Sequence, residues 1–267
     1  MTDPALIQVK IARQRGKEIA GDEDKLAVEE PVEIRLERSP VAITMRTPGH
    51  DDELAAGFLL AESIIRKAED IESITGPKRN LPNVVSIKLK RGLRFDRRRL
   101  KRYFHTSSSC GICGKTTLEA IGLKAQPVCS TFHISLDRLY SLPEKLRSEQ
   151  AAFDETGGLH AAAIFDSCGE PLVVREDVGR HNAVDKVIGA SLLQGRWPLE
   201  NHLLMVSGRA SFEIMQKALV ARIPMVASVS APSSLAVALA RKFKMTLVGF
   251  VRGRSCNIYA GAERIER

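Results

Sequence analysis

The chain has 267 residues, of which 44% are hydrophobic, and it carries a net charge of +8. This composition is that of a globular protein with a sizeable core. No apolar run approaches the roughly 18–20 residues of a membrane-spanning helix, and the start of the chain lacks the features of a signal peptide. We therefore expect a cytoplasmic protein that makes no membrane contact.

The N-terminal part of the chain predicts a small α+β unit. Its first 26 residues are polar and are predicted to be irregular, apart from a strand near residues 7–11. Apolar and polar residues then alternate in two stretches that indicate a half-buried antiparallel pair, and a helix with an acidic first turn follows. The elements expected after residue 26 are strands at 32–36, 41–45 and 84–90 and a helix at 51–65.

Strands and helices alternate in the C-terminal half, which favours a mainly parallel sheet flanked by helices. A helix is expected to begin at Ser141-Leu142-Pro143, because serine caps helices and proline suits their first turn. The later expected strands are 159–166, 171–176, 202–206, 225–229 and 245–251, with helices around 184–192, 212–219 and 233–243. The sequence thus predicts an α/β fold with an N-terminal α+β domain at 1–125 and a larger domain at 126–267.

Basic residues are concentrated in one block, at residues 91–102. Such a block attracts an anionic partner such as a phosphorylated cofactor or an acidic protein surface, although a solvated segment would look the same. Its aromatic neighbours are few, and no known nucleic-acid module surrounds them. We therefore do not expect nucleic acid as a partner.

Two cysteines, Cys110 and Cys113, follow this block in a run of small and hydroxylic residues. Nearby positive charge favours the thiolate, which is the form that attacks sulfur or binds metal. Structural zinc usually needs a second pair of ligands, which the sequence lacks, so no metal is expected. Two buried structural cysteines would need apolar surroundings that Gly111 and Gly114 do not provide.

Two kinds of thiol chemistry remain for this pair. A dithiol oxidoreductase usually carries its cysteines where a helix opens in an early βαβ unit, and this pair lies elsewhere. A persulfide carrier fits better, because a thiolate can accept a sulfane sulfur from a donor and release it to an acceptor. The other cysteines, Cys129, Cys168 and Cys256, are scattered, which argues against a disulfide framework and leaves them as small packing residues.

Four loops follow predicted strands and should meet at one edge of the sheet, where ligands bind in such folds. They share small or hydroxylic residues at the start of a helix, and three carry arginine, which together favour a phosphate or nucleotide site. The loops are residues 177–182, 207–211, 230–234 and 252–255. His181 is a candidate for chemistry, whereas His160 is predicted to be a core histidine. Asp177 and Asp185 could orient a base or ribose, or simply begin and solvate a helix.

Four segments with these features resemble the sulfur carrier proteins required for formate dehydrogenase activity. The segments are residues 108–115, 175–186, 207–211 and 230–236, and the resemblance extends over roughly residues 30–265. It implies a sulfurtransferase that takes sulfur from a cysteine desulfurase and passes it to the molybdenum bis-guanine-dinucleotide cofactor before insertion into formate dehydrogenase. Within the family pattern, Cys110 is the persulfide carrier and Cys113 is the second cysteine.

The resemblance also implies a cytidine-deaminase-like larger domain and a cofactor-binding segment near the C-terminus. Deaminases use an H-x-E motif and a later cysteine pair, and both are missing around His160, so no deaminase activity is expected. A cofactor-binding chaperone that moves no sulfur is the alternative function, and a homodimer is left open. The expected cofactor-binding residues are His181, Ser207, Gly208, Arg209, Phe250, Val251, Arg252, Gly253, Arg254 and Ser255.

Overall fold

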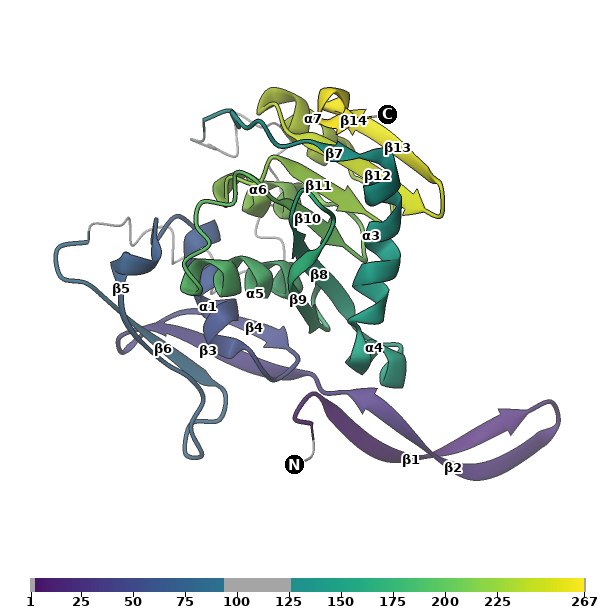
Figure 1. Cartoon of the computed structure of the whole chain (residues 1–267). Coiled ribbons are helices and arrows are strands. Elements are labelled where there is room, and N and C mark those ends of the chain that lie inside the picture. The colour runs from purple at the N-terminus through teal and green to yellow at the C-terminus, as the bar shows by residue number, and fades with distance from the viewer. Residues whose placement is uncertain (1–2, 94–125, 267) are drawn as a thin grey trace.

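The computed structural model describes residues 3–93 and 126–266. Figure 1 shows a projecting N-terminal ribbon, a small sheet and a larger sheet with helices on both faces. The fold is therefore mixed α/β, as the sequence predicts. Cys110, Cys113 and residues 94–102 of the basic block lie outside the described residues.

The N-terminal ribbon is a long two-stranded hairpin that extends from the body of the molecule (Figure 1). Strand β1 (Leu6–Arg15) pairs with β2 (Glu18–Ala27) through a turn at Gly16, whose φ is +61°. The strand expected near residues 7–11 is confirmed, but the prediction of an irregular segment is wrong. Most residues of β2 are exposed, so the strand lacks the apolar alternation that a half-buried strand shows.

The small sheet has four strands in the order β4-β3-β6-β5. The expected antiparallel pair is present, and β6 runs parallel to β3. A register shift pairs Ile34 with Ala42 and Arg35 with Pro40, so the bulge turns Ile43 outwards, where it is 60% exposed. The strands are β3 (Glu30–Leu36), β4 (Ser39–Arg46), β5 (Ile71–Thr75) and β6 (Val84–Leu89).

The large sheet has six strands in the order β13-β12-β11-β10-β8-β9. Only β10, β11 and β12 pair in parallel, whereas β8, β9 and β13 pair with their neighbours antiparallel. The expectation of a mainly parallel sheet is therefore corrected to a mixed sheet. The strands are β8 (His160–Phe165), β9 (Pro171–Asp177), β10 (Leu203–Val206), β11 (Met225–Ser228), β12 (Thr246–Arg252) and β13 (Ser255–Ala260).

Helices cover both faces of the large sheet (Figure 1). Ala162 and Ile164 of β8 belong to the core shared with α5 (Arg180–Leu193), α6 (Phe212–Val220) and α7 (Ser234–Lys242). The alternate residues Ala161 and Ala163 belong to the core under α3. The period of two in a strand thus divides the apolar side chains between two layers.

Helix α3 (Leu136–Ser148) begins earlier than the sequence suggested. Ser135 caps it by accepting a hydrogen bond from the backbone N–H of Arg138, and Pro143 lies inside the helix. Ser141, the expected cap, instead donates its hydroxyl to the Arg138 carbonyl at 2.8 Å. The shorter elements are helix α4 (Ala151–Thr156), the 3₁₀ turns Ala68–Asp70 and Ala262–Arg264, and the parallel pair β7 (Ile134–Ser135) and β14 (Ile265–Glu266).

Helix α1 (Asp51–Ala61) joins the small sheet to the large one by packing against α5. One apolar core contains residues of β3 and α1 together with residues of the helices and strands of the larger part. The predicted domain boundary between residues 125 and 126 stays a prediction. Within the described ranges, no helix combines the length and apolarity that crossing a membrane requires.

Candidate functional site

Strands β9, β10, β11 and β12 all point the same way, so the loops that follow them lie on one edge of the large sheet. Main-chain hydrogen bonds join successive loops. Ser233 N donates to Ala210 O at 3.0 Å, and Phe250 N donates to Ser230 O at 3.2 Å. Ser207 closes the contact with β8, because its hydroxyl accepts from Ala161 N at 2.9 Å.

His160, Arg180 and Gly208 meet at this edge. A methyl group added at Gly208 would lie 3.3 Å from His160 Nδ1 and 3.8 Å from Arg180 Cδ, so the glycine keeps the backbone open between the two side chains. Burial lowers the pKa of His160, and the positive charges of Arg180 and His181 lower this pKa further. The Arg180 guanidinium and the His160 imidazole therefore lie on either side of the Gly208 backbone at this edge.

Arg180 carries a buried Nε that has no hydrogen-bond partner within the part of the chain that the structure describes. A buried donor left unpaired is unfavourable, so a ligand that accepts from this guanidinium would recover a hydrogen bond. Helix α5, which Arg180 begins, has neither a side-chain cap nor an acidic residue in its first turn. The free N–H groups and the dipole of such a helix start favour an anion.

The other two helix starts at the edge differ from that of α5. Helices α6 and α7 are capped by serine hydroxyls, with Ser211 accepting from Ile214 N at 3.4 Å and Ser233 accepting from Ala236 N at 3.2 Å. In addition, α6 has Glu213 in its first turn. The start of α5 is therefore the more favourable of the three for an anionic ligand.

His181 contacts α6 through its Nε2 atom. This nitrogen lies 2.9 Å from Glu213 Oε2 and 3.1 Å from Ser211 Oγ. The His181 and Glu213 side chains are only 13% and 15% exposed, so the contact is shielded from solvent. The sequence reasoning missed Glu213, although its position in a first turn, four residues before Lys217, was a usable signal.

Asp177 organises the loop before α5 from a fully buried position. Its carboxylate accepts from Gly179 N at 2.8 Å and Asn182 Nδ2 at 2.9 Å, and it also accepts from Thr47 N at 3.2 Å. Lys186 Nζ completes the arrangement at 2.7 Å. Both carboxylate oxygens are thus used within the protein, so Asp177 supports the loop and does not orient a base or ribose.

Asp185 is likewise committed to an internal contact. Lys217 Nζ lies 2.8 Å from each of its carboxylate oxygens. Burial raises the pKa of Asp185, while the carboxylate raises the pKa of Lys217 against the opposing effect of burial. The pair is charged, because an ammonium that donates to both oxygens of one carboxylate is the arrangement of an ion pair.

The segment expected to bind cofactor spans the end of β12 and the start of β13. Phe250 has a positive φ of 53° and is partly exposed. The guanidinium carbon of Arg252 lies 6.0 Å from the centroid of the Phe250 ring. Arg254 is exposed and pairs with Asp137 at 3.0 Å. Val251 is buried in the core under α3, so only its backbone is available to a ligand. Of the remaining expected residues, Arg209, Gly253 and Ser255 are exposed and Gly208 is half-buried.

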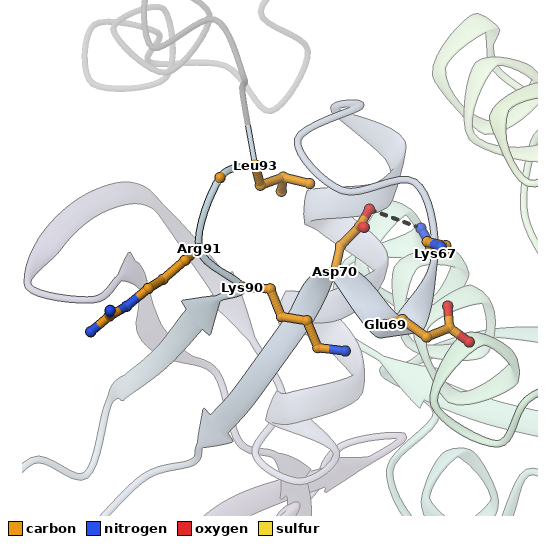
Figure 2. A pocket seen from close by; sticks show the side chains of 7 residues that line it. Lys67, Glu69, Asp70, Lys90, Arg91 and Leu93 are labelled. Atoms are coloured by element: carbon orange, nitrogen blue, oxygen red, sulfur yellow. Dashed lines mark hydrogen bonds between the residues drawn. The ribbon is translucent and has the colours of Figure 1, made fainter.

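A separate depression lies where the first described range ends, at Leu93 (Figure 2). It encloses about 360 Å³ and is formed by the 3₁₀ turn before β5 and the end of β6. Asp70 stabilises the turn by accepting from Arg66 N at 2.7 Å and Lys67 N at 3.3 Å. The residues that line the depression are Lys67, Glu69, Asp70, Lys90, Arg91, Gly92 and Leu93.

The described cysteines differ in exposure, and the described side chains offer no ready metal site. Cys129 and Cys168 are exposed and Cys256 is half-buried, so the first two are not the packing residues that the sequence suggested. Burial raises the pKa of the Cys256 thiol. Among the described residues, no group of three or more His, Cys, Asp or Glu side chains is placed to hold a metal ion.

Comparison with known proteins identifies the family. The sequence profile of the FdhD/NarQ family matches residues 27–266. The chain is 49% identical over 265 residues to the sulfur carrier protein FdhD of Streptomyces coelicolor, covering 96% of this chain and 94% of that protein. It is 52% identical over 258 residues to the sulfur carrier protein FdhD of Mycolicibacterium paratuberculosis, covering 94% of both chains.

A solved structure agrees with this result. The crystal structure of a protein from Desulfotalea psychrophila, provisionally assigned as a formate dehydrogenase accessory protein, superposes with a TM-score of 0.79 at 26% identity. The match covers 98% of this chain and 100% of that one. The profile match and the near-full-length similarity to two sulfur carriers, at 49% and 52% identity, show that the chain belongs to the FdhD/NarQ family.

Proposed function

We propose that the protein is a cytoplasmic sulfurtransferase that carries sulfur as a persulfide on Cys110. A cysteine desulfurase would supply the sulfur, and the molybdenum bis-guanine-dinucleotide cofactor would receive it before insertion into formate dehydrogenase. The observation that carries the proposal is the similarity to proteins named sulfur carriers, which extends over nearly the whole chain at 49% and 52% identity. Cys110 and Cys113 supply the thiols that such a role needs.

The loading step is a thiol exchange. The Cys110 thiolate attacks the outer sulfur of the donor persulfide, a new S–S bond forms on Cys110, and the donor cysteine leaves as a thiolate. Sulfur is conserved and no external oxidant is needed. Cys113 lies three residues after Cys110, and attack of its thiolate on the inner sulfur would form a Cys110–Cys113 disulfide and release hydrosulfide to the acceptor. A thiol reductant would then restore the two cysteines.

The edge of the large sheet supports the second part of the proposal, which is binding of the cofactor as substrate. Its guanine dinucleotide arms carry phosphates. The start of α5, which has no side-chain cap, and the Arg180 Nε, which has no partner in residues 3–93 and 126–266, suit such an anion. The exposed Arg209 lies on the loop after β10, and the exposed Arg252 ends β12 at the same edge. Ser207 and Gly208 provide a hydroxyl and open backbone beside His160.

The test is mass spectrometry after incubation with a cysteine desulfurase and cysteine. The protein should gain about 32 Da per sulfane sulfur, located on the peptide that contains Cys110. A Cys110→Ala variant should lose this gain, and Cys129→Ser, which removes an exposed thiol elsewhere, should retain it. Equal loading of wild type and Cys110→Ala would defeat the proposal.

A cofactor chaperone that moves no sulfur is the second candidate function. It is favoured by the fact that the described site residues are suited to binding an anionic ligand. This candidate requires that Cys110→Ala binds cofactor normally and still restores formate dehydrogenase activity. A variant that binds cofactor but leaves the enzyme inactive would instead support sulfur transfer.

A further inference from the structure

We propose that Glu213 is a positioning residue that fixes the orientation and tautomer of His181 for contact with the guanine nucleotide of the cofactor. The inference rests on the proposed function only for the identity of the ligand. The contact itself is a 2.9 Å approach of Glu213 Oε2 to His181 Nε2, from which most solvent is excluded. The remaining Glu213 oxygen, Oε1, is buried and has no partner among the residues described.

Two side-chain contacts at matching positions, His181–Glu213 and Asp185–Lys217, hold α5 and α6 in register. His181 and Asp185 are four residues apart on α5, and Glu213 and Lys217 are four residues apart on α6, so each pair lies on one helix face. The acidic partner belongs to α6 in the first contact and to α5 in the second. A slip by one turn would bring Lys217 against His181, so the Asp185–Lys217 pair disfavours any register that separates Glu213 from His181.

The contact determines which nitrogen of His181 is offered to a ligand. A ring nitrogen that donates to a carboxylate carries the proton, so Nδ1 is the acceptor in the neutral ring. The described residues make no hydrogen bond to Nδ1, whereas Nε2 contacts both Glu213 and Ser211. His181 belongs to the first turn of α5, next to Arg180, whose Nε has no partner among the residues that the structure describes. Glu213 therefore acts on the ligand site through His181, without contacting the ligand itself.

Nuclear magnetic resonance of the imidazole nitrogens tests the positioning directly. In the wild type, neutral His181 should carry its proton on Nε2. Glu213→Leu should give a mixture of the two tautomers, whereas Glu213→Gln retains an acceptor oxygen and should preserve the wild-type form. Glu200→Gln is the matched control, because Glu200 pairs with Arg222 and does not touch His181.

Calorimetric titration with guanosine diphosphate gives the second measurement. Glu213→Leu should bind about tenfold more weakly, equivalent to about 1.4 kcal/mol, while Glu213→Gln and Glu200→Gln should stay within about twofold of the wild type. Thermal unfolding should show that each variant is folded. A folded Glu213→Leu protein with unchanged tautomer and affinity would overturn the inference.

The two proposals can fail separately. A wild-type protein whose neutral His181 carries the proton on Nδ1 would refute the positioning role, even if no Glu213 variant folds. A wild-type protein that shows the expected tautomer but does not bind guanosine diphosphate would instead count against the nucleotide part of the proposed function. In that case, the tautomer change in Glu213→Leu would still support the positioning of His181.

Discussion

Gly57 of α1 lies directly against the backbone carbonyl of Asp185 in α5, so closely that an added methyl group would lie 1.9 Å from that oxygen. Gly189 makes the reciprocal contact, because a methyl group there would lie 1.8 Å from the Glu53 carbonyl. The two helices thus approach each other backbone to backbone. This close packing connects the small sheet to the helix that begins the candidate site.

Substituting either glycine should separate these helices. We expect Gly57→Ala and Gly189→Ala each to lower the free energy of unfolding by about 3 kcal/mol, because the clashing atoms are backbone and cannot move aside. Urea unfolding measures the loss. Gly21→Ala is the control, since nothing lies within 4 Å of a methyl group there, and an equal loss in the control would contradict this account.

Acid should weaken the link between α1 and β9. Burial opposes ionisation of Glu53, but the two hydrogen bonds from Arg175, at 2.5 and 2.7 Å, and the contact with His50 lower its pKa to about 2. Because the folded pKa lies below the ordinary value of 4.5, this stabilisation is complete above pH 4.5 and is lost as the pH falls towards 2.

The Glu53 contribution should be about 2 kcal/mol after allowance for partial solvent screening. It is measured as the difference in unfolding free energy between wild type and Glu53→Gln at several pH values. The difference should shrink between pH 4.5 and pH 2. A difference that stays constant over this range would show that the charge of Glu53 does not contribute.

Replacing Lys186 alone should lower the free energy of unfolding more than replacing both Asp177 and Lys186. Lys186→Met leaves a fully buried carboxylate without its counter-ion and should cost about 3–5 kcal/mol. The double variant Asp177→Asn/Lys186→Met should recover part of that loss, because no charge is then left unpaired. Chemical denaturation of the single and double variants measures the coupling, and additive effects would argue against a charged pair.

Alkylation should distinguish the described cysteines. Cys129 and Cys168 are exposed and should react with iodoacetamide in the native protein. Cys256 is half-buried and has a raised pKa, so its thiolate is scarcer near neutral pH and it should react more slowly. Peptide mass spectrometry over a time course checks the order. Faster labelling of Cys256 than of Cys168 would refute it.

Local pattern predicted most of the secondary structure. The alternation of Val32, Ile34 and Leu36 with polar residues was sufficient to predict β3. After residue 159, apolar strand segments alternate with segments of helical periodicity, and this predicted the strands and helices of the large sheet. The pattern failed where burial does not follow local alternation. The exposed strand β2 has no apolar face, and the bulge beside Ile34 reverses the faces of β4.

The sequence alone determined the family resemblance, the spacing of Cys110 and Cys113 and the loops at the sheet edge, because each depends on residues close together in the chain. Only the tertiary structure decided that Asp177 is a buried support, that α5 has the open helix start, and that Glu213 meets His181. Glu213 and His181 are separated along the chain by the rest of α5, by β10 and by the loops on either side of β10. Their contact arises because apolar burial brings α5 and α6 onto the same face of one sheet, and short-range periodicity carries no information about which helices become neighbours.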